Sequence, residues 1–266
     1  MYNDLTLIVK RFPTDWPCCR LYALGDIHVG SEQFSERAIK KKIQIIQEDP
    51  YAVASVCGDL GDYGLKNSIS NVYRQTLSPA EQQRYIKELL EPIKDKIVSL
   101  VPGNHENRIT KETGLCPLYD IAVLLGIQDV YRENVAILKL SFGQQSNRKR
   151  QNAFIIITTH GSSIRKHQRH MMSYQGVDAS ISGHSHSPMY YPHGVIKIDA
   201  NRATAKWAAY HEIVVDANLV PGGYSIKNEY EIAPPPELQY LELRVIRDTD
   251  RNRTMHKVID YHAIQI

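Results

Sequence analysis

The first half of the chain alternates between short apolar runs and amphipathic segments. The apolar runs, each of which stops at or near a glycine, cover residues 21–25, 51–56 and 97–100. The segments with apolar side chains at helical spacing cover residues 33–47, 79–90 and 118–125. Ser78 followed by Pro79 is typical of a helix N-terminus. Strands that alternate with amphipathic helices predict an α/β fold with a parallel sheet.

The second half is predicted to be mostly strands. The strand-like segments cover residues 135–142, 154–159, 178–181, 190–198, 205–215 and 241–245. Residues 162–175 are expected to form a loop or a short helix, and residues 143–152 a basic hairpin connection that contains Arg148, Lys149 and Arg150. No repeat or low-complexity linker divides the chain. We therefore predict one domain over residues 1–266, with a motif core at 21–200 and a β-rich part at 201–266.

Composition and charge limit the classes of protein without naming one. With 266 residues, 42% hydrophobic and 23% charged, the chain resembles an ordinary globular protein. Its net charge of +3 neither requires nor excludes a polyanionic partner, and the basic run 40–42 is expected to be a solvated helix face. The four cysteines show no C-x-x-C spacing, so neither a zinc cage nor a disulfide framework is predicted. No secretory signal or membrane span is evident, so we expect a cytoplasmic protein without a membrane partner.

Metal-ligand residues follow five of the predicted strands. They are Asp26 and His28, Asp59 and Asp62, Asn104 and His105, His160, and His184 and His186. In extended backbone, side chains two positions apart point the same way, which would place Asp26 and His28 on one face. A parallel crossover would bring Asp59 beside Asp26 at the same sheet edge, where open α/β sheets bind ligands.

The residue types indicate which metal such a cluster would hold. Carboxylate, imidazole and amide ligands without thiolate suit manganese, iron or zinc better than calcium. There are more ligands than one metal needs, so two metals sharing a carboxylate is the simplest arrangement. Two metals about 3.5 to 4 Å apart stabilise the attacking and leaving oxygens of a displacement at phosphorus.

The order of these motifs resembles that of the calcineurin-like metallophosphoesterase superfamily. Its signature is D-x-H, G-D-x-x-D, G-N-H-[DE], a single H, and G-H-x-H. Here it corresponds to Asp26-Ile27-His28, Gly58-Asp59-Leu60-Gly61-Asp62, Gly103-Asn104-His105-Glu106, His160 and Gly183-His184-Ser185-His186. All five motifs are present in order between residues 26 and 186.

The resemblance implies a layered α/β/β/α sandwich of two mixed β-sheets flanked by helices, with a dimetal site at the C-terminal ends of strands. One metal would be held by Asp26, His28, Asp59 and His186. The other would be held by Asp59, Asn104, His160 and His184. We expect two divalent cations, manganese first, with iron, zinc or nickel as the other candidates. The implied reaction is in-line attack of a metal-bridging hydroxide on a phosphodiester or phosphomonoester, with His105 assisting the leaving group and Asp62 orienting His105.

The substrate is less well defined than the reaction. Tyr63 and Pro102 stand where the phosphoprotein phosphatase branch of the family carries phosphate-binding arginines, so protein phosphatase activity is not expected. We take Arg108 and Arg165 as candidate substrate contacts. The basic segment 165–170 and Arg148, Lys149 and Arg150 keep a nuclease open as a second interpretation. A catalytically silent phosphoesterase fold that binds proteins is the third, and the oligomeric state is not predicted.

Overall fold

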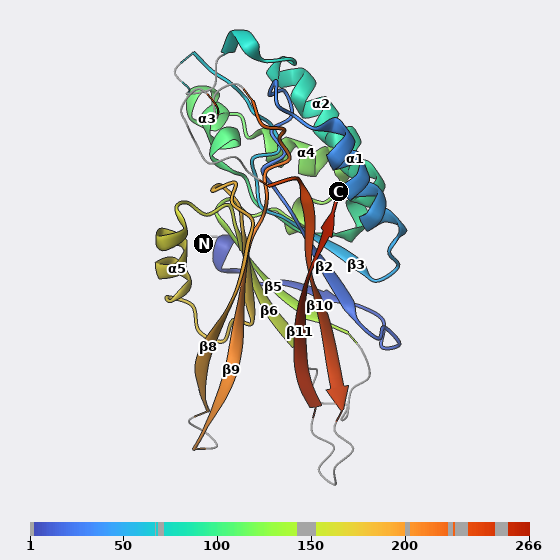
Figure 1. Cartoon of the computed structure of the whole chain (residues 1–266), viewed down its shortest axis with the longest axis vertical. Coiled ribbons are helices and arrows are strands. Elements are labelled where there is room, and N and C mark those ends of the chain that lie inside the picture. The colour runs from blue at the N-terminus through green and yellow to red at the C-terminus, as the bar shows by residue number, and fades with distance from the viewer. Residues whose placement is uncertain are drawn as a thin grey trace.

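The structure is a computed structural model, and it describes residues 3–66, 68, 72–142, 153–199, 203–222, 226, 234–247 and 255–266. In these parts of the chain the strands form one sheet of six strands and one of five. Helices α1 and α2 lie on one side of the two sheets and α5 on the opposite side (Figure 1). The predicted basic connection at 143–152, with Arg148, Lys149 and Arg150, lies outside the described residues.

The five-stranded sheet contains the three strands that the apolar runs predict. Its order is β11 (Met255–Gln265), β10 (Glu237–Arg247), β2 (Cys19–Leu24), β3 (Ala52–Val56) and β4 (Ile97–Leu100). Strands β2, β3 and β4 are parallel neighbours, so their carboxyl ends meet at one edge. Every residue of β3 and β4 is buried, as expected for parallel strands that are covered on both faces.

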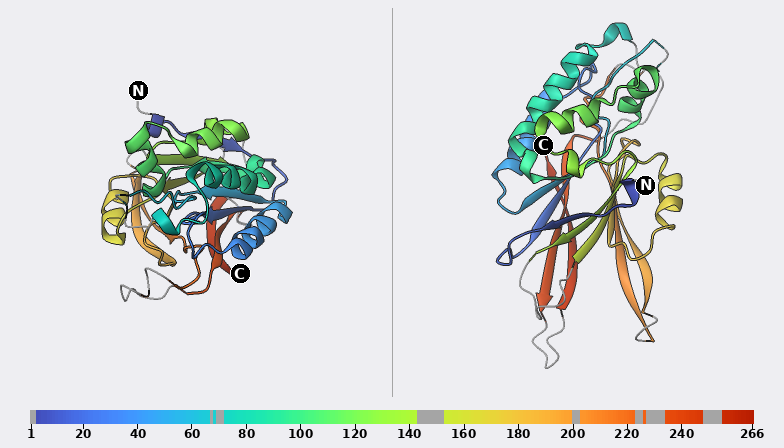
Figure 2. Two further views of the ribbon diagram at one scale, coloured as in Figure 1. Left: turned by 90° about the horizontal axis from the view of Figure 1, so that it is seen from above. Right: turned by 180° about the vertical axis from the view of Figure 1, so that it is seen from behind.

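The six-stranded sheet contains β6 and β7, the two strands that precede the candidate ligands His160, His184 and His186. Its order is β1 (Ile8–Arg11), β5 (Val135–Ser141), β6 (Ala153–Thr159), β7 (Ala179–Ser182), β9 (Thr204–Val214) and β8 (Met189–Asp199). Strands β6 and β7 are parallel, whereas β8 and β9 form an antiparallel hairpin. Figure 2 shows from behind that the β8–β9 and β10–β11 hairpins extend away from helices α1 to α4. Strand β1 was not predicted, because only its first two residues, Ile8 and Val9, are apolar and the basic Lys10 and Arg11 follow.

The helices confirm most of the predicted segments. They are α1 (Glu36–Glu48), α2 (Pro79–Leu90), α3 (Asn104–Thr113), α4 (Pro117–Leu125) and α5 (Ile164–Met171), with short 3₁₀ turns at Asn3–Leu5, Val72–Arg74, Glu91–Lys96 and Gln128–Val130. Ser78 caps α2, and Glu81 Oε2 accepts a hydrogen bond from the Ser78 N–H at 2.8 Å. Helix α3 was not among the predicted helices, since Pro102 and Gly103 indicate a turn after the apolar run 97–100. It is polar and buries only Glu106 and Ile109, so hydrophobic periodicity does not reveal it.

One large hydrophobic cluster joins the two sheets. It includes Leu21 and Val53 of the five-stranded sheet and Leu138 and Ile156 of the six-stranded sheet. A smaller cluster of Val135, Ile157 and Met171 lies beneath α5. These contacts place the sheets face to face between two helical layers, so the predicted α/β/β/α arrangement of two mixed sheets is confirmed. The prediction of a single domain remains a prediction.

The basic run at 40–42 is not uniformly solvated, which corrects the expectation from the sequence. Lys42 is only 3% exposed, and its Nζ lies 2.9 Å from Asp216 Oδ1. Lys40 and Lys41 are exposed. Helical periodicity explains the difference, because Lys42 shares the inward face of α1 with Ile39 and Ile46.

Candidate metal centre

The loops that carry the candidate ligands have unusual backbone conformations. The non-glycine residues of these loops with positive φ are Asp26 (46°), His28 (54°), Asp59 (52°), Tyr63 (43°), His184 (72°) and His186 (55°). The expectation that Asp26 and His28 share a face through extended backbone is therefore wrong. A left-handed conformation costs a non-glycine residue about 1 to 2 kcal/mol, and such strain concentrates at functional sites. The left-handed backbone at Asp26 and His28 turns the loop after β2 sharply at both residues.

The loops after β2 and β3 are held against each other by main-chain hydrogen bonds. The Asp26 N–H donates to Gly58 O at 3.0 Å, and the Ile27 N–H donates to Asp59 O at 2.8 Å. Farther along, the Asp62 N–H donates to Val29 O at 2.9 Å. The two ligand loops thus extend the parallel pairing of their strands, which fixes Asp26 and Asp59 relative to each other.

Asp26, His28 and His186 form the first group of candidate ligands. One ligand atom from each lies within 4.8 Å of the others, and the two Nε2 atoms of His28 and His186 are 3.0 Å apart. Asp26 is fully buried; its Oδ2 accepts a hydrogen bond from the His184 N–H at 2.8 Å, while its buried Oδ1 has no hydrogen-bond partner. Burial raises the pKa of Asp26 to about 8. A buried carboxylate oxygen without a partner, facing two imidazoles, fits a bound cation.

Asp59, His160 and His184 form a second group with ligand atoms within 4.8 Å of one another. Asn104 joins it, because its Oδ1 lies 2.9 Å from His160 Nε2 and 2.7 Å from His184 Nδ1. His160 Nδ1 lies 2.8 Å from Cys57 O, and a proton on Nδ1 leaves Nε2 free to face the site. Burial alone would lower the pKa of His160, but the hydrogen bond and negative charge of Asp59 outweigh it and raise the pKa to about 9.

Asp59 occupies the position between the groups. It is 1% exposed, and it also belongs to a third close set, with His28 and His105. Burial would raise the pKa of Asp59, but the hydrogen bond from His160 and the surrounding imidazoles hold it well below its usual range. A carboxylate that stays ionised between two ligand groups has the location that a bridging ligand requires.

Glycines next to the ligands leave no space for a side chain. A Cβ at Gly103 would lie 2.0 Å from Asp59 Oδ1, and a Cβ at Gly183 would lie 2.6 Å from Asp26 Oδ2. The backbone therefore closes tightly around two carboxylates whose oxygens face the imidazoles. Together with the unpartnered oxygen of Asp26, this arrangement fits a pair of divalent cations.

His105 lies beside the two groups, at the second residue of α3. Its Nδ1 lies 2.6 Å from the backbone oxygen of Asp62 and 3.4 Å from Asp62 Oδ1, and its Nε2 lies 3.7 Å from Asp59 Oδ2. Burial would lower the pKa of His105, but the hydrogen bond with Asp62 and the charge of Asp59 outweigh burial and raise it. His105 thus directs Nε2 toward the candidate ligands and keeps Nδ1 on Asp62.

The two arginines predicted to bind substrate lie in different surroundings. Arg108 Nη2 is 3.1 Å from His105 Nε2, so Arg108 lies next to the site. Arg165 is exposed in the first turn of α5, and no contact among the described residues joins it to either ligand group. The structure brings the seven predicted metal ligands, His105, Asp62 and Arg108 together, and it does not bring Arg165 to them.

Glu106 is a residue of the site to which the sequence analysis assigned no role. It is 1% exposed, and its carboxylate accepts hydrogen bonds from four backbone N–H groups. These belong to Asp59 (2.9 Å), Leu60 (2.7 Å), Gly61 (3.2 Å) and Gly103 (2.8 Å). One side chain thereby connects the loop after β3 with the start of α3. A glutamate three residues after a helix-capping glycine is the local signal that could have identified it.

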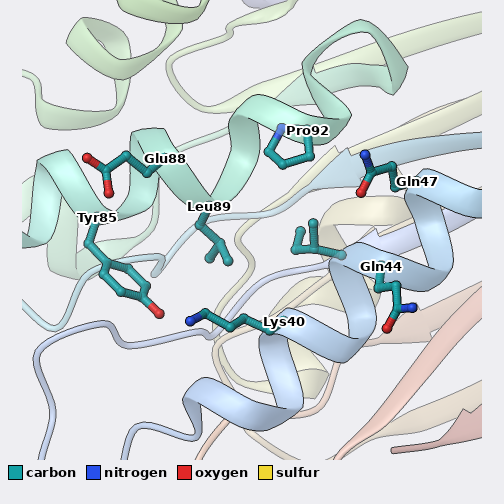
Figure 3. A pocket seen from close by; sticks show the side chains of 8 residues that line it. Lys40, Gln44, Gln47, Tyr85, Glu88, Leu89 and Pro92 are labelled. Carbon is teal, nitrogen blue, oxygen red and sulfur yellow. The ribbon is translucent and has the colours of Figure 1, made fainter.

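A surface cavity lies away from this cluster. It has a volume of about 280 Å³ and is bordered by Lys40, Ile43, Tyr85 and Leu89 between α1 and α2 (Figure 3). None of the candidate ligands lines it. We assign the cavity no part in the metal centre.

Among the described helices, none combines the length and the apolar composition needed to cross a membrane.

Comparison with known proteins identifies a family over most of the chain. The profile of the calcineurin-like phosphoesterases matches residues 19–188, the range that contains all seven candidate ligands. No curated protein matches the chain. Among solved structures, Vps29 of Chaetomium thermophilum is 8% identical with a TM-score of 0.41, and the match covers 93% of this chain and 97% of that one.

Two further solved structures are similarly distant. A protein of Streptococcus pneumoniae described as a predicted phosphoesterase is 10% identical with a TM-score of 0.37, covering 92% of this chain and 98% of that one. A phosphatase of Mycoplasma pneumoniae is 11% identical with a TM-score of 0.36, covering 93% of this chain and 94% of that one.

Proposed function

The chain belongs to the calcineurin-like phosphoesterase family, and from this premise we propose that it hydrolyses a phosphodiester or a phosphomonoester with the help of two divalent cations. The observation that carries the proposal is the convergence of seven carboxylate, imidazole and amide ligands from five separate loops beside His105. A chance collection of surface residues would not bury Asp26 and Asp59 together.

The proposed ligand sets share Asp59. One cation is assigned to Asp26, His28, Asp59 and His186. The other is assigned to Asp59, Asn104, His160 and His184. We propose manganese as the first candidate, with iron, zinc or nickel as alternatives, because oxygen and imidazole donors suit these ions. Bound there, such cations activate water for attack and neutralise charge on the phosphoryl group.

The protein's own groups supply the remaining chemistry. The hydrogen bond with Asp62 and the charge of Asp59 outweigh burial and raise the pKa of His105, which favours the imidazolium form, so we propose that His105 gives a proton on Nε2 to the leaving oxygen. Asp62 holds the opposite nitrogen of the ring. At the N-terminus of α3, which begins at Asn104, the His105 N–H donates to Asp59 Oδ1 at 2.8 Å. We propose that the partial positive charge of this helix end also attracts the phosphate of the substrate. We propose that Arg108 contacts a phosphate oxygen.

Hydrolysis of nitrophenyl phosphate and bis-nitrophenyl phosphate by manganese-loaded protein tests this function. We expect turnover by the wild type, loss of most turnover with retained manganese in His105→Ala, and normal turnover in a control, His262→Ala, at an exposed histidine of β11. Asp59→Ala should lose both metal and activity. Full activity in metal-stripped protein or in Asp59→Ala would refute the proposal. Protein that binds no metal at all would favour a catalytically silent binding role.

A nuclease is the second candidate, and the exposed face of α5 favours it. Arg165, Lys166, Arg169 and His170 are exposed on this helix, which contains no acidic residue. Helix α5 connects parallel strands β6 and β7, so its first turn follows shortly after His160, at the carboxyl edge of β6. Basic side chains at this edge would attract a phosphodiester backbone.

Cleavage of single-stranded and double-stranded oligonucleotides tests the nuclease. We expect a double variant, Arg165→Gln with Arg169→Gln, to reduce oligonucleotide cleavage while leaving hydrolysis of bis-nitrophenyl phosphate unchanged. No cleavage of either oligonucleotide by manganese-loaded wild type excludes this candidate.

A cytoplasmic location and a single domain over residues 1–266 remain part of the proposal.

A further inference from the structure

The carboxylate of Asp62 is held by Gln75, which lies 13 positions further along the chain. Gln75 Nε2 donates to Asp62 Oδ2 at 2.5 Å. The other oxygen, Oδ1, lies 3.4 Å from His105 Nδ1 and 3.5 Å from His28 Nδ1. Because the two oxygens have different partners, Gln75 fixes the rotation of the carboxylate that faces the histidines.

The direction of the Gln75 amide follows from its partners. The Gly64 N–H donates to Gln75 Oε1 at 3.3 Å, and Gln82 Nε2 donates to the same oxygen at 3.0 Å. The amide oxygen therefore faces two donors and the NH₂ group faces Asp62, which can only accept when ionised.

Gln82 anchors this arrangement from inside α2. It is fully buried, its Oε1 accepts from the Tyr63 N–H at 2.9 Å, and its Nε2 also donates to Leu77 O at 2.9 Å. A buried amide is tolerated when its donors and acceptor are satisfied. Both ends of Gln82 are bound to backbone, so it offers Gln75 a rigid support.

Two glycines leave the space that the glutamines occupy. A Cβ at Gly30 would lie 2.3 Å from Gln82 Nε2, and a Cβ at Gly64 would lie 2.8 Å from Gln75 Nε2. The backbone around Asp62 is thus shaped to admit both amides. The chain of contacts runs from α2 through Gln82, Gln75 and Asp62 to His105.

We infer that Gln75, supported by Gln82, is a positioning residue for proton donation by His105. The inference rests on the proposed phosphoesterase function. As the bond between phosphorus and the leaving oxygen breaks, the Nε2–H bond of His105 breaks and the leaving oxygen gains that proton. The imidazole becomes neutral and keeps its second proton on Nδ1, against Asp62. The Nδ1 side of the ring faces both the backbone oxygen of Asp62 at 2.6 Å and its carboxylate at 3.4 Å. Gln75 acts by holding that carboxylate where it keeps the ring in the orientation that this transfer needs.

Leaving-group dependence separates positioning from general structural support. Nitrophenolate departs without much help from an acid, whereas phenolate needs the proton. With nitrophenyl and phenyl esters of the same phosphate, we expect Gln75→Leu to lower kcat about tenfold or more for the phenyl ester and less than about threefold for the nitrophenyl ester. Manganese content and KM should not change. Gln44→Leu, at an exposed glutamine of α1, is the matched control.

Equal losses with both esters, or no loss with either, would overturn the inference. Loss of manganese from Gln75→Leu would also overturn it, because Gln75 would then support the ligand His28 rather than His105. Gln75 is half-buried, so its replacement by leucine is compatible with folding.

A spectroscopic experiment tests positioning without any turnover. In zinc-loaded protein labelled with ¹⁵N at histidine, we expect the His105 Nδ1–H resonance to be sharp in wild type and in Gln44→Leu, and broadened or absent in Gln75→Leu. An unchanged resonance in Gln75→Leu refutes the inference even if the enzyme is active. If wild type hydrolyses neither ester but the resonance behaves as expected, the proposed function fails while the positioning of His105 by Gln75 stands.

Discussion

The carboxylate of Glu106 accepts a hydrogen bond from the backbone N–H of Asp59 at 2.9 Å, although the two residues are 47 positions apart. The acceptor lies in the first turn of α3, and the donor is the residue that lies between the two ligand groups. This contact ties the position of the central carboxylate to the start of the helix that carries Asn104 and His105.

Replacing Glu106 should therefore loosen the loop after β3. We expect Glu106→Gln to reduce the free energy of unfolding by about 2 to 3 kcal/mol, because hydrogen bonds to a charged acceptor are lost and the new NH₂ group faces backbone donors. Urea unfolding measures the change, with Glu112→Gln on the exposed side of α3 as the control. Equal stability of the two variants would show that the four hydrogen bonds contribute little.

Gly103 should tolerate no side chain, for a steric reason. Its φ of −95° is open to any residue, but a Cβ would lie 2.0 Å from Asp59 Oδ1. We expect Gly103→Ala to displace Asp59 and to weaken manganese binding at least about tenfold, which corresponds to about 1.4 kcal/mol. Isothermal titration calorimetry measures this. Gly114→Ala, in the left-handed cap of α3 with open space around it, should cost stability and leave manganese affinity unchanged.

The pH dependence of stability in metal-free protein should report on Asp26. Burial raises its pKa from 3.8 to about 8. At a pH between about 4 and about 8, Asp26 keeps its proton in the folded state but has released it in the unfolded chain. The contribution of Asp26 to the stability of the fold is therefore fully present below about pH 4 and is lost as the pH rises through about 8. We expect chelated wild type to unfold at lower urea as pH rises from about 5 to about 8, and Asp26→Asn to show a smaller decline. Identical slopes would contradict this assignment.

Lys42 should be essential for the stability of the fold, whereas the adjacent Lys41 should not be. Its Nζ lies 2.9 and 3.0 Å from the two oxygens of Asp216, and both side chains are buried. Lys42→Met leaves a buried carboxylate without a counter-charge, which destabilises a fold by about 3 to 5 kcal/mol. Thermal or urea unfolding of Lys42→Met and of the exposed control Lys41→Met makes the comparison. A small, equal effect in both variants would mean that other groups stabilise Asp216, such as the Glu237 N–H, which donates a hydrogen bond to Asp216 Oδ2.

The sequence by itself determined the strands and helices whose signals are local. The apolar runs that became β2, β3 and β4 and the cap at Ser78 depend on neighbours within a few residues, so periodicity and capping chemistry sufficed to predict them. The five motifs in order also predicted, through the resemblance to the family, which residues would converge. Parallel pairing explains this for the loops after β2, β3 and β4, which meet at one edge of the five-stranded sheet, whereas β6 and β7 belong to the other sheet.

Only the tertiary structure decided how those residues converge. The left-handed backbone at Asp26 and His28 is imposed by the pairing of the loops after β2 and β3, and such strain has no local signature. The roles of Glu106, Gln75 and Lys42 depend on partners that lie 13 to 174 positions away in the chain. Burial converts these polar side chains into fixed supports, because an amide or a charge removed from water must find a partner. The partner becomes known only when distant segments are placed side by side.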